Sequence, residues 1–171
     1  MHETPGYHGC YLRVDLSTEV STSVPLDASI LRSYLGGSGL GAALLLKEHA
    51  AAVDPLAPEA VLAFVFSPLV GSPLTTSAKF AVVSKSPLTL RINDSLASSG
   101  FALAGKKTGH DAIVLVGRAQ QPSILIVDDN DVRLESAEDI SGFSNRETQS
   151  QLRRRFGPEF QTATIGPAGE R

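Results

Sequence analysis

Short apolar segments rich in β-branched and aromatic residues limit most strongly what this chain can fold into. Pro, Gly, Ser or Asp bound each segment, a combination typical of strands that end in turns. We therefore expect these segments to be core strands of one sheet system. They are "VLAFVF" at residues 61–66, "FAVVS" at 80–84, "AIVLVG" at 112–117 and "ILIV" at 124–127.

The N-terminal part predicts a β-hairpin followed by two helices. Residues 10–16 alternate apolar and polar side chains, as a half-buried strand does, and residues 20–24 repeat the alternation after a turn. Asp27 can cap a short helix through Leu35 by accepting a hydrogen bond from a free backbone N–H. Residues 40–49 are apolar almost all round, which predicts a buried helix.

Two polar segments and a capping pattern complete the expected outline. Residues 67–79 and 84–100 consist mostly of Ser, Thr, Pro and Gly, and we interpret both as long loops. Ser144 and Glu147 form a capping-box pattern at the start of a C-terminal helix. That helix carries one stripe of Thr148, Leu152 and Phe156, and a last strand is expected at residues 162–165. The whole pattern predicts one α+β domain over residues 1–171, with more strand than helix.

Composition and charge exclude several classes of protein. The net charge of −3 comes with no concentrated basic face other than Arg153–Arg155, which we interpret as the solvated face of a helix, so we expect no nucleic-acid partner. The single cysteine, Cys10, excludes an internal disulfide and favours the cytoplasm. The apolar runs are far too short to span a bilayer, so we expect no membrane segment.

The stretch "GFALAGKKTG", Gly100 to Gly109, differs at one position from the sequence motif of a phosphate-binding loop. A true loop of this kind joins a strand to a helix and places Ser or Thr after the lysine. Here Lys107 takes that place, and a strand follows the motif instead of a helix. We therefore expect a short helix over residues 101–107 that ends at Gly109, with Lys106 and Lys107 near its negative C-terminal end.

The second glycine cluster and the histidines do not define a site by themselves. "GGSGLG" at residues 36–41 lacks the dinucleotide spacing, and a tight helix–helix turn is favoured over presentation of backbone N–H groups to an anion. His8 and Cys10 are the closest pair of metal-ligand types, but two ligands are too few. We expect an exposed histidine, a small buried cysteine, no metal site and no catalytic residues.

Motifs in a fixed order along nearly the whole chain resemble the N-terminal domain of the tungsten-containing aldehyde:ferredoxin oxidoreductases. They are "LRVDLST", "YLGGSGLGAALLLKE", "DPLAPE", "SPLVGS", "VVSKSPLT", "GHDAIVLVGRA" and "IGPAGE". The resemblance implies a β-rich N-terminal domain of mixed sheets with a few short helices. In that family a bis-pterin tungsten cofactor rests on this domain, and helical domains follow it.

The resemblance also implies cofactor-binding residues in the two polar segments. Lys79 stands where the family has an arginine directed at the pterin. Leu96 stands where it has an asparagine near the pterin phosphates and their bridging magnesium, and Ser98 replaces a glycine. Ser38-Gly39 replaces an Arg-Gly pair. Lysine keeps the charge but lacks the planar bidentate fork of arginine, and Leu96 offers only its backbone.

The function implied is that of a cofactor-seating domain in an oxidoreductase that converts aldehydes to carboxylic acids with ferredoxin as electron acceptor. The domains that carry the [4Fe–4S] cysteines are absent, so we expect a truncated chain that is inactive alone, because Cys10 cannot hold a cluster. The alternative is a non-catalytic remnant of the scaffold that acts as a binding or interaction module. The resemblance does not decide whether the cofactor metal is tungsten or molybdenum, and it allows a homodimer.

Overall fold

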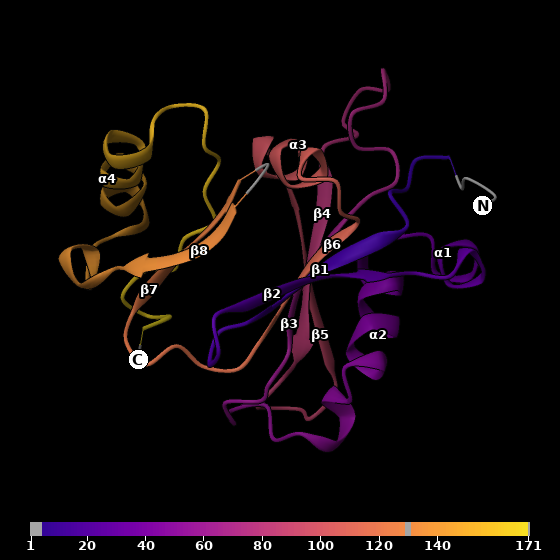
Figure 1. Cartoon of the computed structure of the whole chain (residues 1–171), viewed down its shortest axis with the longest axis horizontal. Helices are drawn as coiled ribbons and strands as arrows, with labels where there is room; N and C mark the ends of the chain where they lie inside the picture. The colour runs from indigo at the N-terminus through magenta and orange to yellow at the C-terminus, as the bar shows by residue number, and fades with distance from the viewer. Residues whose placement is uncertain (1–4, 129–130, 171) are drawn as a thin grey trace. The chain divides into compact units, whose positions relative to one another are not determined.

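The computed structural model describes residues 5–128 and 131–170. The chain divides into two compact units, one ending at Arg118 and one beginning at Ala119. Each unit has its own sheet, and each is described by itself below (Figure 1). The fold is α+β with mixed strand directions, as the sequence predicted.

A six-stranded sheet in the order β2-β1-β6-β3-β4-β5 forms the centre of the first unit. β1 and β6 are parallel, whereas the other neighbours are antiparallel. The N-terminal hairpin is confirmed, since β1 pairs with β2. The strands are β1 (Cys10–Asp15), β2 (Val20–Pro25), β3 (Leu62–Phe66), β4 (Lys79–Lys85), β5 (Ile92–Ser98) and β6 (Ala112–Val116).

Helix α2 (Gly37–Lys47) packs on one face of this sheet and encloses the main core. The core side chains are fully or almost fully buried, and they include Leu40, Leu44, Val65, Val83 and Val114. Before α2 comes the short helix α1 (Ala28–Tyr34), and after it comes a 3₁₀ turn at Ala50–Ala52.

Two expectations about these helices were wrong in detail. Asp27 is the residue before α1, but its side chain makes no capping hydrogen bond. Helix α2 begins at Gly37, three residues before the expected start. The glycines are needed there because a Cβ at Gly39 would lie 2.6 Å from the Tyr34 carbonyl oxygen, and Gly36 has a φ of +81°. A close turn between two helices therefore outweighs the poor helix propensity of glycine.

Helix α3 (Gly100–Lys107) is the short helix expected within the "GFALAGKKTG" stretch. Ser99 caps its first turn by accepting a hydrogen bond from Phe101 N–H, and Gly109 follows it with a φ of +81°. The Phe101 ring packs on Phe80 with ring centres 5.1 Å apart, on the sheet face opposite to α2. Strand β5 comes directly before this helix, but the motif residues form the helix itself and strand β6 follows them, so they do not make a phosphate-binding loop between a strand and a helix.

The expectation of a long loop over residues 84–100 was wrong, because β5 occupies residues 92–98 of it. Strand β5 lies at the edge of the sheet and all seven of its residues are exposed. The apolar alternation that identifies a strand is therefore missing, and backbone pairing with β4 alone defines the element.

The second unit contains a two-stranded sheet and one long helix. The antiparallel strands are β7 (Ser123–Asp128) and β8 (Asp131–Ser136), followed by a 3₁₀ turn at Glu138–Ile140 and helix α4 (Asn145–Phe156). The capping box of Ser144 and Glu147 is confirmed, and Thr148 and Leu152 are buried on the predicted stripe. Phe156 is half-buried and packs on Phe160.

One strand prediction is confirmed in part and one is wrong in this unit. "ILIV" is a strand as predicted and forms most of β7, but it belongs to the two-stranded sheet and not to the six-stranded one. Residues 162–165 form no strand with any part of the chain that the structure describes, although their side chains alternate between half-buried and exposed. A short β-branched segment does not reveal whether a partner strand is available.

Candidate cofactor-binding site

The three cofactor-binding residues that the family resemblance implies lie together on two paired strands. Lys79 at the start of β4 is the direct antiparallel partner of Ser98 at the end of β5, and Leu96 is the partner of Ala81. Side chains of directly opposed residues, and of residues two apart on one strand, project from the same face of a sheet. Lys79, Leu96 and Ser98 therefore share one face at one end of the sheet.

This face is the one on which α2 packs. Val83 has the same orientation as Lys79 and Ala81, and it lies against Gly41 of α2. Near the start of α2, the Ser38 hydroxyl donates a hydrogen bond of 2.5 Å to the carboxylate of Asp94 on β5. Asp94 also shares the face of Leu96 and Ser98. We call this exposed surface of Ser38, Lys79, Asp94, Leu96 and Ser98 the shelf.

The N-terminus of α2 lies beside the shelf. The residue before the helix is Gly36, which has no side chain to accept hydrogen bonds from the first-turn N–H groups. A Cβ there would meet Pro68 Cδ at 2.8 Å and the Phe66 carbonyl oxygen at 3.1 Å. Gly36 thus lets the helix begin close to the end of β3, which brings the positive end of the helix dipole to this end of the sheet.

Backbone groups of β5 also point toward open surface. The hydrogen bonds from Ser99 N–H to Ala78 and from Ser86 N–H to Arg91 fix which pairs of the β4–β5 ladder are hydrogen-bonded. In an antiparallel ladder hydrogen-bonded and non-hydrogen-bonded pairs alternate. Residues 92, 94, 96 and 98 are consequently in non-hydrogen-bonded pairs. The Leu96 carbonyl therefore points away from β4, toward the free edge.

The charges of the shelf are few and accessible. Lys79 is exposed, and within the described residues its ammonium group has no hydrogen-bond or ion-pair partner. The Ser98 hydroxyl donates to the Ala78 carbonyl at 3.1 Å. Leu96 leaves 72% of its surface exposed without a hydrogen-bonding side chain. The side chains of all three predicted residues are exposed.

The shelf can hold charged groups but offers no redox chemistry of its own. Lys79 and the uncapped start of α2 suit an anion such as a phosphate, and the Leu96 carbonyl and Asp94 carboxylate suit a hard cation. The described residues contain no cluster of three or more His, Cys, Asp or Glu side chains that could bind a metal. The shelf residues therefore offer groups for an anion and for a hard cation on the same face of the sheet.

Sequence reasoning missed Asp94 and the outward carbonyls of β5. In a strand over residues 92–98, every second side chain projects from the same face. This segment was interpreted as a loop, so the rule was not applied to it. Once the strand is known, Asp94 must share the face of Leu96 and Ser98.

The "GFALAGKKTG" lysines have structural partners or lie at the helix end. Lys106 is buried and its ammonium group forms an ion pair with Asp111, which is fully buried. Lys106 was expected only to lie near the C-terminal end of the helix, so its burial was missed.

His8 is exposed as expected, and its Nε2 lies 2.9 Å from the Lys106 carbonyl oxygen. Cys10 is half-buried, so the expectation of a buried cysteine was too strong.

No helix in the described part of the chain has the length and apolar character needed to cross a membrane.

A mixed six-stranded sheet with short helices packed on it defines an α+β domain. Residues 11–171 match the family described as "Aldehyde ferredoxin oxidoreductase, N-terminal domain". The chain belongs to this family, and the matched residues are its N-terminal domain.

Relatives and a solved structure are consistent with this assignment. The tungsten-containing aldehyde ferredoxin oxidoreductase of Pyrococcus furiosus is 37% identical over 166 residues, which are 96% of this chain and 27% of that protein. The aliphatic sulfonate oxidoreductase, WOR-like subunit, of the same organism is 32% identical over 91% of this chain and 25% of that protein. The active site complex BamBC of benzoyl coenzyme A reductase, in complex with 1,5-dienoyl-CoA, superposes with a TM-score of 0.91 at 30% identity, over 96% of this chain and 25% of that one. This chain thus spans about a quarter of the length of these relatives.

Proposed function

We propose that this chain seats a pterin cofactor carrying tungsten, as the N-terminal part of an oxidoreductase that converts aldehydes to carboxylic acids with ferredoxin as electron acceptor. The observation that carries the proposal is the juxtaposition of Lys79, Leu96 and Ser98 on one exposed sheet face. The names of the relatives support tungsten, aldehyde and ferredoxin. The single cysteine supports the cytoplasm as the proposed compartment.

Each group of the shelf has a distinct proposed task. The Lys79 ammonium attracts a pterin phosphate, and the N–H groups at the start of α2 add the positive end of a helix dipole. The Leu96 carbonyl, directed to the free edge of β5, provides an oxygen ligand for a magnesium ion that bridges phosphates. Asp94, oriented by the Ser38 hydroxyl, provides a second oxygen nearby.

The cofactor would supply the redox chemistry, and this domain would supply orientation and hydrogen bonds. A rigid strand pair holds the proposed contacts, because β4 is buried between β3 and β5 and is paired on both edges. Residues on paired strands are positioned more precisely than residues on loops. The shelf therefore positions a ligand without first having to fold around it.

The experiment compares cofactor content between two charge-removing variants. The wild-type chain, Lys79→Met and Arg32→Met are expressed with tungstate supplied, and bound pterin is measured as its fluorescent oxidation product per mole of protein. Arg32 is the control because it is an exposed cation on α1, outside the shelf. We expect several-fold less pterin in Lys79→Met and an unchanged amount in Arg32→Met. Equal pterin in both variants, or none in the wild type, would overturn the proposal.

A further inference from the structure

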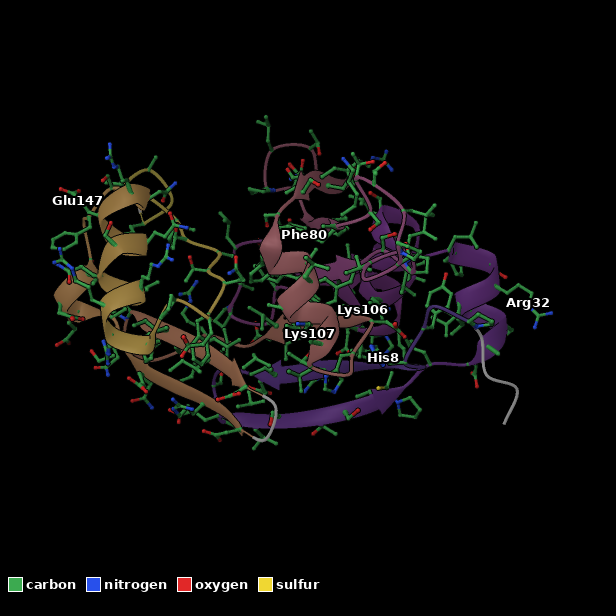
Figure 2. The ribbon with its side chains drawn as sticks, turned by 90° about the horizontal axis from the view of Figure 1, so that it is seen from above. His8, Arg32, Phe80, Lys106, Lys107 and Glu147 are labelled. Atoms are coloured by element: carbon green, nitrogen blue, oxygen red, sulfur yellow. The ribbon has the colours of Figure 1, made fainter. Side chains whose placement is uncertain are left out.

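A groove separate from the shelf lies between the N-terminal segment, the loop that follows β3 and helix α3. Its volume is about 430 Å³, within the range of roughly 300 to 1,000 Å³ that is typical of small-molecule sites. Figure 2 shows His8 close to Lys106 and Lys107 of α3, which form one side of it. The groove is lined by Gly6, Tyr7, His8, Val70, Leu103 and Lys107, with Gly71 and Lys106 completing it.

A buried carboxylate fixes the N-terminal wall of the groove. Asp111 is fully buried and accepts hydrogen bonds from the backbone N–H groups of His8 and Gly9 and from the Lys106 ammonium group. The Lys106 ammonium also lies 5.5 Å from the centre of the Tyr7 ring. These contacts connect residues about a hundred positions apart, so the wall is formed before any ligand arrives.

Among the lining residues that the structure describes, one of the two lysines has no counter-charge. Asp111 neutralises Lys106 within the ion pair. Burial, followed by the nearby Asp111 charge, raises the pKa of Tyr7, so its phenol stays neutral at physiological pH. Lys107 is exposed and has no hydrogen-bond or ion-pair partner among the residues that the structure describes. The charge that remains for a ligand is therefore that of the Lys107 ammonium.

The carbonyl groups at the end of α3 do not compete for that charge. The Gly105 carbonyl accepts from the Thr108 hydroxyl at 2.7 Å, and the Lys106 carbonyl accepts from Gly109 N–H and lies within hydrogen-bond distance of His8. Satisfied carbonyls present less negative potential to an anion than free ones do. The C-terminal end of this helix is thus compatible with a bound anion near Lys107.

The rest of the lining is apolar. Val70 is buried and Leu103 leaves 40% of its surface exposed, which is high for a leucine on a helix that packs against a sheet. Gly71 leaves room, because no atom lies within 4 Å of the place that its Cβ would take, whereas Gly6 lets the N-terminal segment pack against the Pro68 carbonyl oxygen; both have a φ of +84°. A ligand that covers Leu103 and the Tyr7 ring would remove this apolar surface from water.

We propose that this groove binds a small carboxylic acid in its anionic form, with the carboxylate at Lys107 and an apolar body against Tyr7, Val70 and Leu103. One cation at the rim of an otherwise apolar groove is complementary to one anionic group on an apolar molecule. The proposal uses no residue of the shelf and is independent of the proposed function.

The test is a titration of the ¹⁵N-labelled chain followed by amide chemical shifts. Benzoate is the probe, and benzamide is the matched neutral probe of the same shape. We expect saturable shifts at Gly71, Leu103 and Lys107 with benzoate, at millimolar or lower concentration, and about fivefold weaker binding of benzamide. An exposed ion pair of this kind contributes about a fivefold factor in affinity.

Variants separate the groove from non-specific binding. Lys107→Met should weaken benzoate binding about fivefold, and Leu103→Gln should weaken both probes because it makes the apolar wall polar. Arg32→Met removes an exposed cation elsewhere and should change neither, and the spectra themselves report whether each variant is folded. Equal affinity for the two probes, unchanged benzoate affinity in Lys107→Met, or shifts confined to other parts of the chain would each overturn the proposal.

Discussion

Lys79 and Ser98 face each other across β4 and β5, although nineteen positions separate them in the sequence. Their pairing places a free ammonium group next to a hydroxyl at the end of the sheet where α2 begins. The pairing also orients Leu96 and Asp94 on the same face, since both lie on β5 in alternation with Ser98. The register of β4 and β5 therefore determines which of their residues form the shelf.

The contact between Gly41 and Val83 predicts a sensitive position beneath the shelf. A Cβ at residue 41 would lie 2.5 Å from Val83 Cγ2 and 2.9 Å from Val83 Cβ, so Gly41→Ala must push α2 away from β4. We expect a loss of about 1–3 kcal/mol in the free energy of unfolding, measured by urea denaturation. The double variant Gly41→Ala with Val83→Ala should lose less than the sum of the two single variants, and strict additivity would argue against direct contact.

The ion pair of Lys106 and Asp111 predicts a second large effect on stability. Asp111→Ala leaves the Lys106 ammonium buried without a counter-charge and removes the acceptor of two backbone N–H groups. The expected loss is about 3–5 kcal/mol in the free energy of unfolding. Asp94→Asn, at an exposed carboxylate, should cost less than about 0.5 kcal/mol and is the control. Similar losses in both variants would show that the burial of Asp111 is unimportant.

The capping box of α4 predicts a pH dependence of that helix. Hydrogen bonds from the Ser144 side chain and backbone lower the pKa of Glu147 in the folded chain. A carboxyl whose pKa is lowered by folding contributes stability above its unfolded pKa, and this contribution is lost as the pH falls through the folded pKa. Amide hydrogen exchange in α4 should therefore lose protection in acid. In Glu147→Gln this acid-dependent step should be absent, and its persistence would contradict the assignment.

Loss of the cap itself is a separate prediction. Ser144→Ala removes the acceptor of the Glu147 N–H at the first turn of α4. We expect a loss of about 1 kcal/mol in helix stability, seen as faster amide exchange in the first turn. Ser150→Ala, at an exposed position inside the same helix, is the matched control and should not slow or speed exchange in that turn. An unchanged first turn in Ser144→Ala would show that the cap contributes nothing.

Much of the fold could be predicted because its signals are local. The β-branched runs of β3, β4 and β6 and the Ser144–Glu147 cap each depend on neighbouring residues only. Strand β5 could not be predicted, because an exposed edge strand has no buried face and hence no apolar alternation. The start of α2 was also missed, because the need for glycine at residue 39 depends on the backbone of Tyr34.

The candidate site was predicted in part. The family resemblance indicated Lys79, Leu96 and Ser98, and the register of β4 and β5 shows that these three residues lie close together. Asp94 could be added only once that register was known. The ion pair at the groove joins Lys106 and Asp111, and Asp111 also accepts a hydrogen bond from the His8 backbone N–H. No sequence pattern relates His8 to the other two residues.

The central claim is that the shelf seats a pterin cofactor, and the pterin-to-protein ratio of a gain-of-function variant tests it most directly. Lys79→Arg with Leu96→Asn replaces a point charge by a bidentate fork and gives position 96 a hydrogen-bonding side chain. Both positions are exposed, so the fold should be little affected. In protein expressed with tungstate, we expect a higher pterin-to-protein ratio for this double variant than for the wild type. The control is Lys107→Arg with Leu56→Asn, the same substitutions at two exposed positions outside the shelf, and its ratio should be unchanged. A ratio that stays unchanged in the shelf variant, or that rises equally in the control, would contradict the central claim.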